Sequence, residues 1–203
     1  MGYMIKAYFA NYYLHRSDIT FDFSDDNKMT LHTNVAEPWK VTLVDTGQQT
    51  MTGGRIKRIK EYVGDEPFMM TYGDGLGDVD LDKLLDYHKK EGKTITITAI
   101  QPGGRYGMID FDDSGSIKGF REKAVEDGGW INAGFMVMEP GIFDYLTGDD
   151  CTLEFEPFYQ LSSKGEMAAY RHYKYWQCMD TQRERGFLEK RLRDNDAPWK
   201  VWE

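Results

Sequence analysis

The sequence predicts an α/β protein in which helices cover both faces of a mostly parallel β-sheet. Two apolar runs with the character of buried strands, 67–72 and 94–100, flank a stretch in which leucines recur at helical spacing. This order of strand, loop, helix and strand requires a right-handed crossover. Such a crossover makes the two strands parallel and places the connecting helix on a face of the sheet.

The first part of the chain predicts three smaller elements. Residues 3–13 carry aromatic and apolar side chains about one helical turn apart, which predicts a short amphipathic helix. Alternating segments within 18–34 surround an Asp-Asp-Asn turn and predict a β-hairpin. Residues 39–45 have the alternation of a half-buried strand.

Two amphipathic helices are predicted next. From Gly53 onward, apolar residues at helical spacing face the sheet, while the other faces carry the densest cluster of basic residues in the chain. The leucine-bearing helix begins near Leu81, with Asp78 or Asp80 as its N-cap, and ends at Gly92.

The last hundred residues contain short strands with glycine turns at 103–104 and 114–115, followed by longer elements. Neither a repeat nor a linker interrupts the chain, so we predict one domain over residues 1–203. The longer elements, in order, are a strand over 131–138, helices over 141–146 and 153–163, a strand over 167–172 and a helix over 181–193.

Composition excludes several classes of function. The chain has 203 residues, of which 40% are apolar, so it is long enough to bury a sizeable core. Its formal net charge of −9 would repel nucleic acid and anionic membranes, so neither is expected as a partner. No apolar segment is as long as a membrane span, and the two cysteines have no Cys-x-x-Cys spacing. We therefore expect a reduced, cytoplasmic protein. One disulfide between the two cysteines is the alternative.

The four histidines, His15, His32, His88 and His172, lack the spacing of metal ligands. We interpret them as exposed residues or residues at the edge of the core.

Two aspartates are the strongest candidates for metal ligands. Asp74 follows an apolar strand and lies among glycines, and in open α/β sheets ligands bind beyond the carboxyl ends of strands. Asp180 follows a second predicted strand segment. Mg²⁺ needs only one or two carboxylates when phosphate oxygens and water complete its octahedron. The alternatives are that Asp74 is a turn residue and that Asp180 is the N-cap of the last helix.

Six motifs occur in a fixed order along the chain: 44–55 (VDTGQQTMTGGR), 71–75 (TYGDG), 120–123 (FREK), 131–135 (INAGF), 175–181 (YWQCMDT) and 197–203 (APWKVWE). Together they resemble the sugar-phosphate nucleotidyltransferases, in particular the glucose-1-phosphate cytidylyltransferases. The resemblance implies a Rossmann-like fold of the nucleotide-diphospho-sugar transferase type. It also implies a homo-oligomer that transfers CMP from CTP to glucose 1-phosphate with Mg²⁺ and so supplies deoxysugars for surface polysaccharide.

The resemblance also assigns roles to individual residues. Asp74 and Asp180 hold the metal, Arg55 acts in catalysis and at the nucleotide, and Lys123 holds the phosphate of the sugar. A solvated basic helix face is the alternative for Arg55, and ordinary core packing is the alternative for Trp176. The predicted substrate-binding residues are Thr50, Arg55, Tyr72, Gly73, Gly107, Glu122, Lys123, Asn132, Gly134 and Trp176.

One departure from the family pattern concerns the beginning of the chain. The family opens with a strand and a glycine-rich loop that surrounds the triphosphate, and nothing of this type precedes Met1. Roughly 50 residues of a β-α-β unit are expected to be absent. We therefore expect the chain by itself to be inactive. Two alternatives stay open: a non-catalytic sugar-phosphate-binding module, and a nucleotidyltransferase that uses UTP or dTTP.

Overall fold

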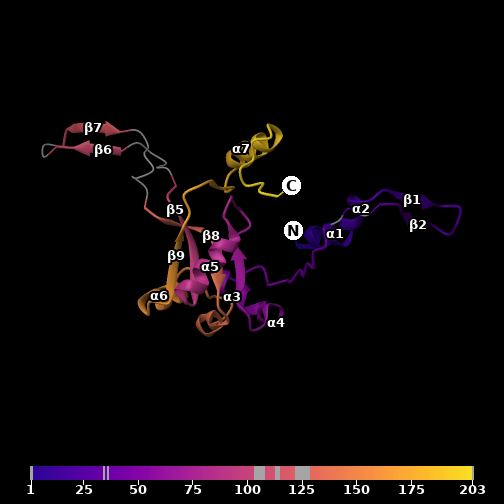
Figure 1. The fold of residues 1–203 in the computed structure, drawn as a ribbon, viewed down its shortest axis with the longest axis horizontal. Coiled ribbons are helices and arrows are strands. Elements are labelled where there is room, and N and C mark those ends of the chain that lie inside the picture. Colours follow the sequence, from indigo (N-terminus) through magenta and orange to yellow (C-terminus); the bar gives the residue numbers. More distant parts are fainter. Residues whose placement is uncertain are drawn as a thin grey trace. The chain divides into compact units, whose positions relative to one another are not determined.

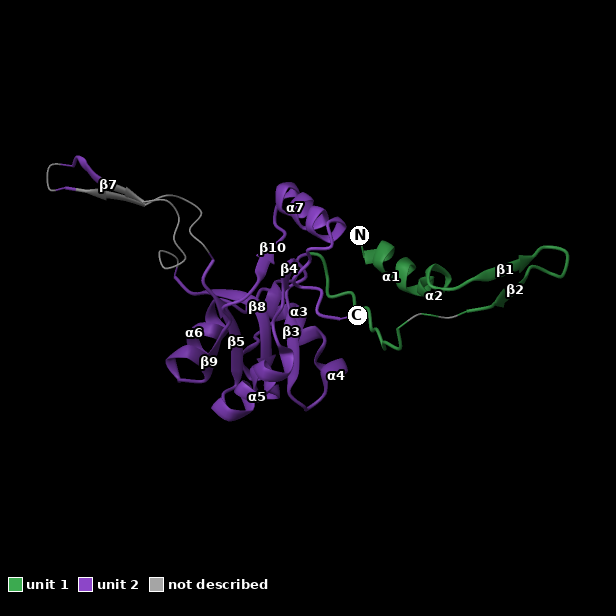
Figure 2. Ribbon diagram, turned by 45° about the horizontal axis from the view of Figure 1, so that its top comes forward, with its two compact units in different colours: residues 1–48 green, residues 49–203 purple. Residues whose placement is uncertain are grey.

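The computed structural model describes residues 2–33, 35, 37–102, 108–112, 115–121 and 129–202, with the backbone alone over 108–111 and 119–121. The chain divides into two compact units, residues 1–48 and 49–203, and each is described by itself (Figure 2). The prediction of one domain over the whole chain stays a prediction.

The first unit begins with two helices where the sequence predicts one. Helix α1 spans Gly2–Ala10 and helix α2 spans Tyr12–His15 (Figure 1). Between them, the side-chain Nδ2 of Asn11 donates to the carbonyl of Ala7 at 2.8 Å. An asparagine side chain that bonds the backbone in this way competes with helical hydrogen bonding, which accounts for the break.

The predicted hairpin is confirmed. Strand β1 (Ile19–Asp22) pairs antiparallel with β2 (Lys28–Leu31). Asp26 and Asn27 occupy the turn with φ of 52° and 58°, a region that these two residue types tolerate best among non-glycine residues.

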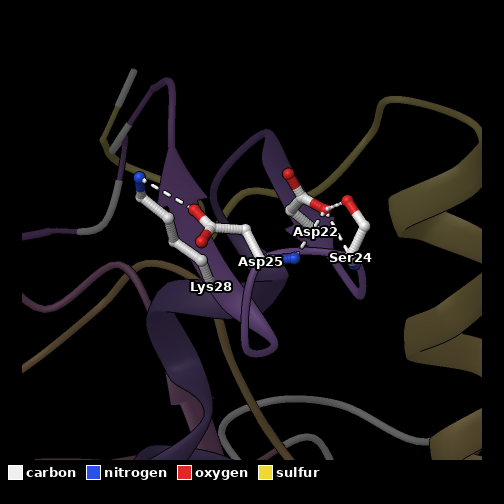
Figure 3. Close-up of polar contacts among 4 residues, drawn as sticks. All are labelled: Asp22, Ser24, Asp25 and Lys28. Atoms are coloured by element: carbon white, nitrogen blue, oxygen red, sulfur yellow. Dashed lines mark hydrogen bonds and ion pairs between the residues drawn. The ribbon is translucent and has the colours of Figure 1, made fainter.

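Asp22 organises the first half of this turn. Its Oδ1 accepts from the Ser24 amide at 2.9 Å, the Ser24 hydroxyl at 2.6 Å and the Asp25 amide at 3.2 Å, while Asp25 pairs with Lys28 (Figure 3). The hydrogen bonds from Ser24 hold the pKa of the Asp22 carboxyl below its ordinary value.

The strand predicted over residues 39–45 is wrong. The described residues 37–47 form no regular element, and Trp39 and Val41 stay exposed. Alternation of apolar and polar residues describes a side-chain pattern, but a strand also needs a neighbour to exchange backbone hydrogen bonds.

The second unit is built on a four-stranded sheet in the order β3-β8-β5-β9. The strands are β3 (Phe68–Thr71), β5 (Ile95–Ile100), β8 (Ile131–Met138) and β9 (Met167–Arg171). Strand β9 is parallel to β5, whereas β8 is antiparallel to both β3 and β5. The predicted α/β class is confirmed, with one strand of the four running against the other three.

Helices pack on both faces of this sheet, as predicted (Figure 1). Met136 and Met138 point to one face, and Val137 between them points to the other, because successive side chains alternate along a strand. The face of Met136 and Met138 packs against α3 (Thr52–Arg58), η2 (Pro140–Tyr145) and α6 (Glu156–Ser163), and the face of Val137 packs against α5 (Leu81–Glu91).

Local signals determine the ends of α5 and α6. Asp80, not Asp78, caps α5, and Gly92 ends it at φ 60°, a conformation in which a Cβ is unfavourable. Helix α6 begins at Glu156 and not at Leu153 as predicted. Pro157 has no backbone N–H, so it is tolerated only in a first helical turn.

The remaining elements fall near their predicted positions. The helix predicted from Gly53 is divided at Ile59 into α3 and a short α4. The glycine turn predicted at 103–104 lies outside the described residues. The other elements are α4 (Lys60–Val63), β4 (Gly75–Gly77), β6 (Met108–Phe111), β7 (Ile117–Arg121), β10 (Trp176–Cys178) and α7 (Gln182–Arg193).

Two histidines are buried, which corrects the expectation that all four lie at the surface or the core edge. His88 is 1% exposed and lies between the hydroxyl of Thr96 at 2.8 Å and the carboxylate of Glu139 at 3.1 Å. His172 is also buried. Both residues have polar neighbours that satisfy a buried imidazole.

The N-cap of α5 gives a prediction about pH. Hydrogen bonds from Lys83 hold the pKa of Asp80 below its ordinary value of 3.8. A carboxyl whose folded-state pKa is lowered stabilises the protein above its unfolded-state pKa, and this contribution is lost as the pH falls through the folded-state pKa. Asp80→Ala should therefore lower the thermal midpoint near pH 7 and have little effect near pH 2, as measured by circular dichroism.

Asp82→Ala is the matched control, because Asp82 is an exposed acidic residue in the same first turn but is not the cap. An equal loss of stability in the two variants would contradict the assignment of the cap.

Candidate functional site

Two short strands bring the predicted metal ligands together. Strand β10 pairs antiparallel with β4, with Cys178 opposite Gly75. The Met179 amide donates to the Asp74 carbonyl at 2.8 Å and extends this pairing by one residue. Asp74 precedes β4 and Asp180 follows β10, so both aspartates lie at the same end of the pair. We call this pair the β4–β10 ribbon.

Both aspartates are exposed to solvent. The alternative role of Asp180 as the N-cap of the last helix is wrong, because Asp180 does not cap α7. Thr181 is the cap: its hydroxyl accepts from the Glu184 amide, and Glu184 Oε2 accepts from the amide of Thr181 at 2.8 Å in a capping box. The side chain of Asp180 is therefore not needed to satisfy the first turn of the helix.

The surroundings of Asp180 contain further potential ligand atoms. Cys178, Asp180 and Glu184 each place one such atom within 4.8 Å of the others. Burial raises the pKa of the Cys178 thiol, and the neighbouring Asp180 raises it further. Glu184 Oε2 already accepts three hydrogen bonds, from the backbone amides of Asp180 and Thr181 and from the Thr181 hydroxyl. Asp74 is not part of this group, and the assignment of Asp74 and Asp180 to Mg²⁺ stays a prediction.

A bulge in β8 shapes the neighbouring part of the site. Along the β5–β8 pairing, Ile97 lies opposite Met136 but Ala99 lies opposite Asn132, so β8 contains extra residues between these points. Gly134 lies in this interval with φ 84°, a conformation open mainly to glycine. The Asn132 side chain closes the bulge by accepting from the Gly134 amide at 2.9 Å.

The bulge makes room for Tyr72, which follows β3. A Cβ on Gly134 would lie 2.6 Å from Cδ2 of the Tyr72 ring. The Asn132 amide donates to the Tyr72 hydroxyl at 3.5 Å, a long contact. Burial raises the pKa of Tyr72, and so does its hydrogen bond to Glu154. The predicted residues Tyr72, Asn132 and Gly134 therefore form one cluster.

Glu154 belongs to this cluster but was not among the residues that the sequence predicts. It accepts a short hydrogen bond from the Tyr72 hydroxyl, and its other oxygen accepts from the Thr52 hydroxyl at 2.6 Å. These partners are 82 and 102 residues away in the chain. The sequence offered no local signal, because Glu154 falls inside a segment that reads as helix and its partners are determined by the tertiary fold.

Trp176 connects β10 to β8 and packs on β4. Its indole Nε1 donates to the Ala133 carbonyl at 2.9 Å. The ring covers Gly75 and Gly77 of β4, where an added Cβ would meet it at 3.3 Å in each case. Trp176 thus attaches the β4–β10 ribbon to the bulged end of β8. Its predicted role as a wall for the sugar stays a prediction.

The start of α3 is closely packed. A Cβ on Gly53 or Gly54 would lie 2.7 Å from Cys151 Sγ or the Asp149 carbonyl, respectively. A helix N-terminus can offer free amides to an anion, but the Gly54 amide already donates to the Cys151 carbonyl at 3.1 Å. Arg55 is exposed on this helix and Thr50 is buried just before it.

The predicted residues thus fall into three groups. Asp74 and Asp180 are brought together by the ribbon, and Gly73 is exposed beside Asp74. Tyr72, Asn132 and Gly134 form the cluster at the bulge, to which Trp176 connects the ribbon. Thr50 and Arg55 lie at the start of α3, which the Thr52–Glu154 hydrogen bond links to Tyr72. Gly107, Glu122 and Lys123 lie outside the described residues.

A profile of the nucleotidyl transferase family matches residues 13–181 of the chain. The chain belongs to this family. It is 48% identical to the glucose-1-phosphate cytidylyltransferase of Salmonella typhi over 203 residues, which cover 100% of this chain and 78% of that protein. It is 30% identical to the mannose-1-phosphate guanylyltransferase catalytic subunit beta of Drosophila melanogaster over 126 residues, 61% of this chain and 34% of that protein.

The fold is also similar to that of a solved structure. HddC from Yersinia pseudotuberculosis superposes with a TM-score of 0.54 at 19% identity, over 71% of this chain and 64% of that chain. This likeness concerns the fold alone. Within the described residues, no helix has both the length and the apolar character that spanning a membrane would require.

The bulge in β8 gives a prediction about stability. Gly134→Ala should lower the free energy of unfolding by about 2 kcal/mol or more, because an L-residue is strained at positive φ and the new methyl group overlaps the Tyr72 ring. Urea unfolding followed by circular dichroism measures the change.

The control is Gly186→Ala, at an exposed site in α7 where a Cβ meets nothing within 4 Å. This substitution should stabilise the protein by about 0.5–1 kcal/mol through helix propensity. The bulge assignment fails if Gly134→Ala is as well tolerated as Gly186→Ala.

Proposed function

We propose that this chain transfers a cytidylyl group from CTP to glucose 1-phosphate and produces CDP-glucose and pyrophosphate. The relationship to the Salmonella typhi cytidylyltransferase over the whole chain supports this assignment. The observation that carries it is the β4–β10 ribbon, which brings together two exposed aspartates that lie about a hundred residues apart in the sequence.

In the proposed reaction, a phosphate oxygen of glucose 1-phosphate attacks the α-phosphorus of CTP, and the bond from that phosphorus to pyrophosphate breaks. The protein contributes by aligning the two phosphates, so no protein nucleophile is needed. Asp74 and Asp180 would hold Mg²⁺, which supplies positive charge to the phosphates when it is bound.

The bulge cluster suits the recognition of sugar hydroxyls. The amide of Asn132 can both donate and accept, and Gly134 permits a sugar ring to approach the backbone closely. Glu154 orients the Tyr72 hydroxyl through their hydrogen bond. We further propose that Lys123 binds the phosphate of the sugar and that Glu122 binds its hydroxyls, as charge-assisted hydrogen bonds do well. The proposed product would supply deoxysugars for surface polysaccharide.

The start of α3 suits a role at the nucleotide. Arg55 is exposed one turn from Thr52, whose hydroxyl connects through Glu154 to Tyr72. A guanidinium can bind a phosphate through two parallel hydrogen bonds. We assign Arg55 to the phosphates of CTP and Thr50 to the nucleotide.

The choice of nucleotide provides the direct test. The protein made from its complete coding sequence should form pyrophosphate and CDP-glucose from CTP, glucose 1-phosphate and Mg²⁺, with kcat/KM for CTP at least about tenfold above that for UTP or dTTP. Chromatography of the nucleotide sugars measures this. Equal rates with all three nucleotides would reject cytidine selectivity, and binding of glucose 1-phosphate without turnover would favour a non-catalytic module.

The metal assignment gives a second prediction. Asp74→Asn or Asp180→Asn should lower turnover about a thousandfold, since loss of a ligand removes several kcal/mol of charge stabilisation from the transition state. Steady-state pyrophosphate release measures the loss. Asp65→Asn is the matched control, because Asp65 is an exposed aspartate near the opposite end of β3 from Tyr72. Activity within about threefold of the parent in both ligand variants would reject the metal assignment.

A further inference from the structure

A buried imidazole lies at the end of the β4–β10 ribbon that is opposite to the two aspartates. His172 follows β9, and its Nε2 lies 3.0 Å from Oδ1 of Asp78 and 3.1 Å from the carbonyl of Tyr175. Asp78 directly follows β4, and Tyr175 directly precedes β10. The imidazole therefore contacts both strands of the ribbon where they leave the pairing.

The backbone around His172 connects this contact to the central sheet. The His172 amide donates to the Ala99 carbonyl of β5 at 2.9 Å. The Asp78 amide donates to the same Tyr175 carbonyl at 3.2 Å that the imidazole contacts. Through its amide and its ring, His172 thus joins β5, the end of β4 and the start of β10.

The ribbon needs such support because of its size. Each of its strands has three residues, and an isolated pair of strands of this length is not stable in water. At the aspartate end, the indole of Trp176 fixes the ribbon to Ala133. At the other end, the ring of Tyr175 stacks on Trp199, and Arg191 lies 4.9 Å from the centre of the Tyr175 ring. At that end, the Asp78 amide donates to the Tyr175 carbonyl, and the His172 ring adds side-chain contacts with both residues.

We propose that His172 is a positioning residue for the metal site: its contacts with Asp78 and Tyr175 hold β4 and β10 in register and so fix the separation of Asp74 and Asp180. This inference rests on the proposed function for the role of the two aspartates. The part that concerns the register of the ribbon stands on the contacts alone.

The proton on His172 follows from its neighbours. A backbone carbonyl and a carboxylate oxygen both accept hydrogen bonds, so Nε2 must carry a hydrogen. The Asp78 Oδ1 atom is buried, and its contact with the ring is electrostatic and not an aligned hydrogen bond. A glutamine can place an amide N–H near the position of Nε2, whereas leucine fills the space without a donor.

Three variants separate this role from general stability. His172→Leu removes the donor, His172→Gln retains one, and Asp78→Ala removes the carboxylate at a less buried position that is easier to change without unfolding. His88→Leu is the matched control, because His88 is an equally buried, hydrogen-bonded histidine that packs in α5 and does not contact the ribbon.

Hydrogen exchange measures how firmly the hydrogen bonds of the ribbon are held. The amides of Met179 and Asp78, which donate across the ribbon, should exchange about tenfold faster or more in His172→Leu and Asp78→Ala than in the parent. His172→Gln should restore protection to within about threefold of the parent. In His88→Leu, any loss of protection should be no greater in the ribbon than in β5.

Binding of Mn²⁺, followed by electron paramagnetic resonance, measures the consequence for the metal site without turnover. Affinity should fall about tenfold to a hundredfold in His172→Leu and Asp78→Ala, as for other residues that orient metal ligands. Parental exchange rates at Met179 and Asp78 in both variants would overturn the proposal. If the ribbon loosens as expected but the parent binds no Mn²⁺ and has no turnover, the positioning role stands and the proposed function fails.

Discussion

The conformation of Gly134 is the constraint on which the arrangement of the site depends. Its positive φ allows the bulge in β8, and two contacts of the site start from the bulged residues. The Asn132 amide lies near the Tyr72 hydroxyl, and the Ala133 carbonyl accepts from the indole of Trp176. The Gly134 carbonyl accepts from the Tyr72 amide at 3.2 Å, which continues the β3–β8 pairing beyond Thr71 and Phe135.

The sequence predicts best those elements whose ends are determined by residues within or next to the element itself. The N-cap and the terminal glycine of α5 are signals within a few residues of the helix, so its ends were found. The strand expected over residues 39–45 failed because the existence of a strand depends on a neighbour that a local pattern does not reveal. The direction of β8 does not follow from its sequence for a related reason: an apolar run shows burial on both faces but not which way the strand runs.

The same distinction holds within the site. That the two aspartates lie at one end of the ribbon is in line with the sequence, in which each follows a strand and belongs to a recognisable motif. Glu154 and His172 could not be found from the sequence, since each acts through residues that only the fold brings near. The residues next to Glu154 and His172 in the sequence do not distinguish them from an ordinary surface glutamate and a core-edge histidine. Residues that orient other residues therefore leave a weaker trace in one sequence than residues expected to touch substrate.

The balance of charge connects the site to the proposed reaction. The described part of the site contains the carboxylates Asp74, Asp180, Glu184 and Glu154. Both proposed substrates are polyanions, and the whole chain is itself negative, so the protein field alone opposes their binding. Hydrogen bonds stabilise some of these carboxylates, as the amides of Asp180 and Thr181 do for Glu184. Asp74 and Asp180 lie exposed at the same end of the β4–β10 ribbon. If they hold Mg²⁺ as proposed, the ion would bring positive charge to a negative site and attract the phosphates of both proposed substrates.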